Sequence, residues 1–134
     1  MNKVVVIAAM VLSLVLPGLA KASGPAVIDV LFMNHGPLRP TLNNMKDLLA
    51  TYDDRLTVRW HDFESREGED FMAKMGVTRH VPLVIWINGK ETMEIDGAPC
   101  TFSGFPSGAG PAMFQGKWTL ELLTKALDMV TKQN

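Results

Sequence analysis

Apolar residues along positions 25–134 fall into continuous runs typical of buried strands and into spacings typical of helices. Residues 25–33 (PAVIDVLFM) are nearly all apolar, which predicts a central strand covered on both faces. From about Pro37, apolar side chains recur every three or four residues, which predicts a helix that ends at Asp53-Asp54. The apolar side chains of this helix are Leu38, Leu42, Met45, Leu48, Leu49 and Tyr52.

Residues 56–63 alternate in a way that predicts a second strand. Val58 and Trp60 would lie on one face of this strand, and Arg59 and His61 on the other.

A short helix, a third strand and a hairpin follow. Residues 64–76 predict the helix, with Gly76 at its carboxyl end. Residues 81–87 (VPLVIWI) are strongly β-forming, and Asn88-Gly89 predicts a tight turn to a partner strand at residues 90–95.

The last helix has Thr119 as its predicted N-cap, with Trp118 placed to pack against Leu123. Its buried stripe consists of Leu120, Leu123, Leu127 and Val130. The resulting order, βαβαββα, predicts an α/β fold of three layers. Right-handed crossovers would build a mixed sheet with helices on both faces, and the hairpin makes the last strand antiparallel.

Residues 1–22 have the pattern of a secretory signal peptide. Lys3 precedes the apolar run of residues 4–16, Pro17-Gly18 interrupts it, and Ala20-Lys21-Ala22 is a small-x-small cleavage pattern. The run is short for a spanning helix, so we expect export to the periplasm or the medium and no membrane span in the mature chain. Cleavage near Ala22/Ser23 would leave one domain, residues 23–134.

The charge balance argues against nucleic acid as a partner. Without Lys3 and Lys21, 11 of the 13 basic residues remain against 14 acidic ones, a net charge of −3. The chain has no basic patch and no run of like charges that would favour nucleic acid or a membrane surface.

The turn His35-Gly36-Pro37-Leu38, between the first strand and the first helix, resembles the Cys-Gly-Pro-Cys active-site turn of thioredoxins. His35 and Leu38 stand where that family has its two cysteines. The sequence is therefore similar to the thioredoxin-like superfamily, and the resemblance implies a thioredoxin-like fold without the dithiol.

Three further features, which with the turn span residues 29–89, carry the same resemblance. Asp29 lies where thioredoxins have a buried aspartate that handles protons for the dithiol. Val81-Pro82 opens the third strand where the family has a cis-proline beside the active-site turn, so the resemblance implies a cis bond. The hairpin at Asn88-Gly89 is the third feature.

The substitutions at the turn exclude dithiol chemistry there. Disulfide exchange needs one thiolate to attack and a second thiol to resolve the mixed disulfide, and neither His35 nor Leu38 supplies one. We therefore expect no disulfide oxidoreductase activity, no catalytic residue and no cofactor. The helix N-terminus at this turn could still receive an anion or a carbonyl oxygen.

Asp29 has two interpretations. An aspartate inside an apolar strand is costly unless it is hydrogen-bonded or protonated. It is either a relic of the redox scaffold that accepts a hydrogen bond, or a proton-handling acid with a raised pKa coupled to His35. The relic is the interpretation that we favour, since no nucleophile remains for it to serve.

Histidines give a weaker alternative. The resemblance places the loops of His35 and His80 together, and these imidazoles, near Cys100 or Asp29 and with His61 at a strand end, could bind zinc or copper. No short-range ligand spacing supports a metal site, so none is predicted.

The segment 96–115 (DGAPCTFSGFPSGAGPAMFQ) is rich in Gly, Pro and Ser. It is either a recognition loop with exposed phenylalanines or a compact loop that packs Phe102, Phe105 and Phe114 over the sheet edge, the interpretation favoured here. Residues 111–115 could add a short edge strand. The only cysteine, Cys100, lies in this segment, away from any helix end, so we expect an ordinary thiol pKa.

We expect a non-catalytic module that binds a peptide or protein in the cleft between the His35-Gly36-Pro37 turn and the loop His80-Val81-Pro82. The alternatives are a redox-linked protein acting through the single thiol Cys100, and a metal-binding protein using His35 and His80.

Overall fold

A computed structural model describes residues 24–132 of the chain, so the predicted signal peptide at residues 1–22 lies outside the described residues. The strands are β1 (Ala26–Phe32), β2 (Leu56–Asp62), β3 (Leu83–Ile87), β4 (Thr92–Ile95) and β5 (Ala98–Thr101). The helices are α1 (Arg39–Ala50), α2 (Arg66–Met75) and α3 (Leu120–Thr131), with short 3-10 turns at Gly36–Leu38, Asp53–Arg55 and Ala112–Phe114.

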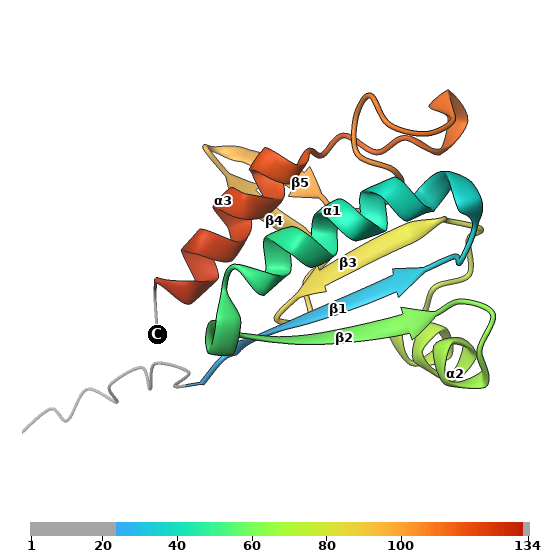
Figure 1. The fold of residues 1–134 in the computed structure, drawn as a ribbon, viewed down its shortest axis with the longest axis horizontal. Helices are drawn as coiled ribbons and strands as arrows, with labels where there is room; N and C mark the ends of the chain where they lie inside the picture. The colour runs from blue at the N-terminus through green and yellow to red at the C-terminus, as the bar shows by residue number, and fades with distance from the viewer. Residues whose placement is uncertain (1–23, 133–134) are drawn as a thin grey trace, which may run out of the picture.

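Three strands form the central sheet in the order β2-β1-β3 (Figure 1). Strands β1 and β2 are parallel, with Ala26 beside Leu56 and Phe32 beside Asp62. Strand β3 is antiparallel to β1, and its first residue, Leu83, lies beside Phe32. The α/β class and the mixed sheet are therefore as the sequence predicts.

The direction of β3 differs from the expected right-handed crossover. Asp62 at the end of β2 and Leu83 at the start of β3 both lie beside Phe32. Helix α2 therefore does not carry the chain back along the sheet. A parallel crossover must return to the opposite end before the next strand begins, and a ten-residue helix spans only about 15 Å. Strand β3 consequently starts at the end where β2 stops.

The turn at Asn88-Gly89 is present, but the strand after it does not extend the sheet. Asn88 and Gly89 have φ angles of 49° and 78°, the left-handed pair that a tight hairpin requires. After a single bridge between Ile87 and Lys90 the chain leaves β3, and β4 pairs with β5 instead. The edge of β3 is bonded by the segment that follows β5, through Ile85 N–H to Phe102 O (2.9 Å) and Gly104 N–H to Leu83 O (2.7 Å).

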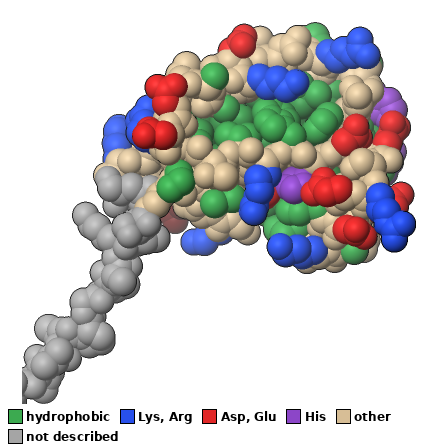
Figure 2. All heavy atoms as spheres, turned by 60° about the horizontal axis from the view of Figure 1, so that its bottom comes forward, with side chains coloured by type: hydrophobic (Ala, Val, Ile, Leu, Met, Phe, Trp, Pro, Cys, Tyr) green, Lys and Arg blue, Asp and Glu red, His purple; other side chains and the backbone are tan. Residues whose placement is uncertain are grey.

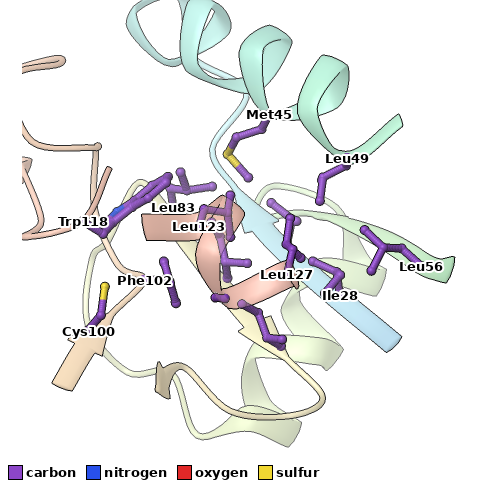
Figure 3. Close-up of a cluster of buried hydrophobic side chains, with 14 of the residues drawn as sticks. Ile28, Met45, Leu49, Leu56, Leu83, Cys100, Phe102, Trp118, Leu123 and Leu127 are labelled. Atoms are coloured by element: carbon purple, nitrogen blue, oxygen red, sulfur yellow. The ribbon is translucent and has the colours of Figure 1, made fainter. Parts of the chain in front are cut away.

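Helices cover both faces of the sheet, as predicted. Helices α1 and α3 pack on one face in a large apolar cluster that includes Ile28, Met45, Leu83 and Leu127 (Figure 3). Helix α2 packs on the other face, where Phe71 belongs to a second apolar cluster with Leu31, Val84 and Trp86. The odd and even residues of β1 thus serve different layers.

Local capping signals have their expected effect. Gly76 has a φ of 68° and ends α2, and the Thr119 hydroxyl accepts a hydrogen bond from the N–H of Leu122 at the start of α3. Helix α2 begins after its N-cap Ser65, whose hydroxyl accepts from Gly68 N–H (2.9 Å).

Between residues 24 and 132, no helix is long and apolar enough to cross a membrane.

Candidate functional site

An apolar pocket of about 200 Å³ lies at the carboxyl end of β1, where the chain turns towards α1. The loop before β3 and the segment after β5 reach the same place. The lining residues are Met33, His35, Pro37, Leu38, His80, Pro82, Phe105, Pro111 and Phe114. The structure thus brings together four of the six residues predicted for the binding cleft, namely His35, Pro37, His80 and Pro82, whereas Gly36 and Val81 do not line it.

His35 stands at the N-cap of the 3-10 turn that precedes α1. Its backbone is extended (φ −101°, ψ 147°), and its carbonyl accepts a hydrogen bond from Leu38 N–H at 3.0 Å. More than half of its side chain is exposed, with Nε2 at 3.9 Å from Oε1 of Glu64. An imidazole in this position contacts solvent and the pocket together.

His80 lies between two phenylalanines at the pocket. Its ring makes edge-to-face contacts with Phe63 (6.1 Å between centroids) and with Phe114 (6.3 Å). These contacts hold the imidazole of His80 at the pocket wall, which His35 also lines.

The predicted cis bond before Pro82 is wrong, because every peptide bond in residues 24–132 is trans. Pro82 still lines the pocket, and its carbonyl accepts a hydrogen bond from Met33 N–H at 2.9 Å. The trans isomer is intrinsically favoured by about 0.5–1 kcal/mol for bonds to proline. The hydrogen bond from Met33 N–H to Pro82 O joins the start of β3 to the end of β1.

The backbone beside Pro82 is available to a partner. Within residues 24–132, the main-chain groups of His80 and Val81 take part in no hydrogen bond. Extended peptides bind other proteins by pairing with such groups at a strand end.

The loop at residues 96–115 is compact, the interpretation favoured from the sequence. Phe102 and Phe105 are buried, and Phe114 is half-buried at the pocket. Residues 98–101 form β5, which the sequence did not reveal. Residues 112–114 form a 3-10 turn in place of the suggested edge strand, and only one bridge joins Phe105 to Gln115.

Cys100 lies on β5 with its thiol in the core, and its residue is 5% exposed (Figure 3). Burial raises the pKa of the Cys100 thiol, so the expectation of an ordinary value is wrong. Because the thiolate is the reactive form, a buried thiol with a raised pKa is a poor nucleophile.

Asp29 lies away from the pocket-lining residues and belongs to a second cluster on the α2 side of the sheet. Its carboxylate accepts two hydrogen bonds from the fork of Arg59, both at 2.7 Å, and a third from Nε2 of His61 at 2.8 Å. Nδ1 of His61 lies 2.5 Å from Oε1 of Glu67, and the ring stacks on Phe71 at 3.7 Å. The partner of Asp29 is therefore His61 and not His35.

The pKa of Asp29 contradicts one of the two interpretations made from the sequence. Burial alone would raise the pKa of Asp29, but hydrogen bonds from Arg59 and His61 and their charges outweigh burial. The result is a pKa below the ordinary value of 3.8. The raised pKa of a proton-handling acid is thus wrong, and Asp29 is an ionised carboxylate in a structural network.

The sequence analysis did not identify hydrogen-bond partners for His61. Both of its ring nitrogens face carboxylate oxygens, Nε2 that of Asp29 and Nδ1 that of Glu67. The sequence placed Arg59 and His61 on one face of the second strand, but it did not give the register that sets Asp29 beside Arg59.

No group of three or more His, Cys, Asp or Glu side chains within residues 24–132 has an arrangement suited to a metal ion. His35 and His80 share the pocket without a third such ligand.

No protein-family model matches this chain, and a search of curated proteins finds no significant match.

Proposed function

We propose that the chain is an exported, thioredoxin-like binding module that holds an extended peptide or protein segment at the pocket of His35, Pro37, His80 and Pro82. The observation that carries this proposal is the pocket itself, which is walled mainly by Met, Leu, Pro and Phe side chains. An apolar cavity of about 150 Å³ is large enough for benzene. A pocket of about 200 Å³ therefore suits one large apolar side chain of a partner.

The free backbone of His80 and Val81 supports a strand-like mode of binding. Main-chain hydrogen bonds to a partner supply affinity, and the adjacent pocket selects the side chain that enters it. This mode needs no cysteine, in keeping with His35 and Leu38 at the turn.

The proposal is tested by measuring the affinity of the purified chain for a set of short unstructured peptides that differ in one large apolar side chain. We expect Phe114→Ala and His35→Ala each to weaken binding about fivefold or more, because both residues form the pocket wall. Met129→Ala, on α3 and 39% exposed, is the matched control and should bind normally.

The same binding assay tests the alternative in which the single thiol, Cys100, captures the partner. Cys100→Ser should leave peptide binding nearly unchanged, because the thiol is in the core and outside the pocket lining. Loss of binding with Cys100→Ser, but not with Phe114→Ala, would favour capture through a mixed disulfide and contradict the proposal.

A further inference from the structure

Within residues 24–132, β2 is an edge strand whose outer side is unpaired. It pairs with β1 along its whole length, and no other segment of residues 24–132 pairs with it. An open edge offers unpaired main-chain N–H and C=O groups to another strand. Next to it, between α1 and β2, lies a groove of about 340 Å³. Its lining residues are Lys46, Leu49, Ala50, Asp53, Leu56, Val58 and Trp60.

The side of the molecule that carries this groove is apolar at its centre. Figure 2 brings the β2 side forward and shows a hollow hydrophobic area with charged side chains around it. Val58 and Trp60 are only half-buried, although both point to the face that packs against α1. The usual protection of an edge, a free charged side chain, is weakened here because the guanidinium of Arg59 is held by Asp29.

We propose that two copies of this chain associate through antiparallel pairing of their β2 edges, about a two-fold axis that passes by Val58. In this register Val58 lies opposite Val58 of the other copy, and Leu56 lies opposite Trp60 of the other copy. On the other face, Thr57 lies opposite Arg59 of the other copy. A register shifted by two residues would place the two Arg59 side chains opposite each other, which is unfavourable.

Charge complementarity selects a second copy as the occupant of the groove. The ammonium of Lys46 lies 5.5 Å from the ring of Trp60, at one end of the groove, and Asp53 lies at the other end, three residues before Leu56. Because Trp60 faces the other copy's Leu56, Lys46 of each copy meets Asp53 of the other. Neither residue forms an ion pair within residues 24–132. A two-fold axis makes this contact twice.

The pairing joins the two three-stranded sheets into one sheet of six strands. None of the residues that line the His35 pocket belongs to β2, so the pocket stays open in the pair. The inference stands independently of the proposed function.

Sedimentation of the purified full chain over a concentration series tests the proposal. We expect a monomer–dimer equilibrium in the wild type. Lys46→Asp and Asp53→Lys should each weaken the dimer about tenfold, because each makes two like-charge contacts across the axis. The double variant restores opposite charges and should return the dissociation constant close to the wild-type value.

A matched control uses Asp96 and Lys125, which form an ion pair at 2.7 Å away from the groove. Asp96 has a positive φ of 53°, as Asp53 has at 48°, so Asp96→Lys and Asp53→Lys carry the same backbone cost. Lys125→Asp and Asp96→Lys should leave the dimer unchanged. A chain that is monomeric at every concentration, a dimer insensitive to the Lys46 and Asp53 changes, or a double variant that stays weak would each overturn the proposal.

Discussion

The pocket at the end of β1 and the charged cluster around Asp29 lie on the same small sheet. They differ in whether their polar groups have hydrogen-bond partners. In the pocket, His35 is exposed and the main chain of His80 and Val81 is unpaired within residues 24–132. In the cluster, Asp29 and His61 are buried, and every nitrogen and oxygen of these two side chains has a partner.

The comparison teaches where binding capacity resides. A fully satisfied buried network gains little from a ligand, because each new contact must replace an existing hydrogen bond. An apolar pocket beside free main-chain groups gains from every group that a partner brings. The cluster that looks catalytic by composition is thus structural, and the plainer pocket is the candidate site.

The largest expected effect is on the cluster. Asp29→Ala should lower the free energy of unfolding by about 3 kcal/mol, because it leaves His61 and the fork of Arg59 without their carboxylate. Asp47→Ala, an exposed aspartate on α1, should change it by about 0.5 kcal/mol or less. Urea unfolding of the two variants measures both.

The folded fraction of Asp29→Ala should keep the wild-type affinity for peptides at the pocket. Loss of peptide binding by the folded protein would show that the cluster and the pocket act as one site, and the comparison would then fail.

The second-largest effect should come from acid, which weakens the charged cluster around Asp29. The pKa of Asp29 is lower in the folded chain than its ordinary value of 3.8, so the folded state favours the ionised form. Its contribution to stability is complete above about pH 5 and is lost as the pH falls below 3.8 towards the lower, folded value. Urea midpoints from pH 6 to pH 2 should therefore show a gap between wild type and Asp29→Asn that closes in acid. A gap that stays constant over this range would mean that the carboxylate is not the titrating group.

A change in the pocket should affect stability less than the Asp29 change does. Phe114→Ala should cost about 1 kcal/mol, since Phe114 is only half-buried, while it weakens peptide binding. Thermal unfolding and peptide titration on the same sample separate the two effects. A loss of stability as large as that of Asp29→Ala would show that Phe114 belongs to the core instead of to a binding surface.

The smallest expected change in stability concerns Glu67, the exposed partner of His61. Glu67→Gln should cost about 0.5 kcal/mol, because the glutamate side chain is 63% exposed and its ion pair is screened by water. Glu69→Gln alters the charge of the same first turn of α2 without touching His61, so it is the matched control. Equal urea midpoints for the two variants would show that the His61–Glu67 contact adds nothing beyond the helix dipole.

The sequence alone determined the segments and the faces of this protein. Continuous apolar runs located β1 and β3, and alternation assigned Val58 and Trp60 to one face of β2 and Arg59 and His61 to the other. The sequence also predicted the caps at Gly76 and Thr119 and the turn at Asn88-Gly89. These features depend on neighbours only a few residues apart, so local physics suffices.

Much of the candidate site was also predictable. His35, Pro37, His80 and Pro82 were expected to meet because a turn and a loop of the resembled fold lie together. The sequence showed Phe105 and Phe114 only as aromatic residues on a long loop, and it did not predict that they line the pocket.

Tertiary structure decided the remainder. The direction of β3, the pairing of β4 with β5, and the trans bond before Pro82 depend on where distant segments end in space. The partner of Asp29 depends on the register of β1 against β2, which places Arg59 and His61 within reach and leaves His35 outside. Periodicity fixes which face a side chain takes, whereas only the packed chain fixes which side chain stands opposite.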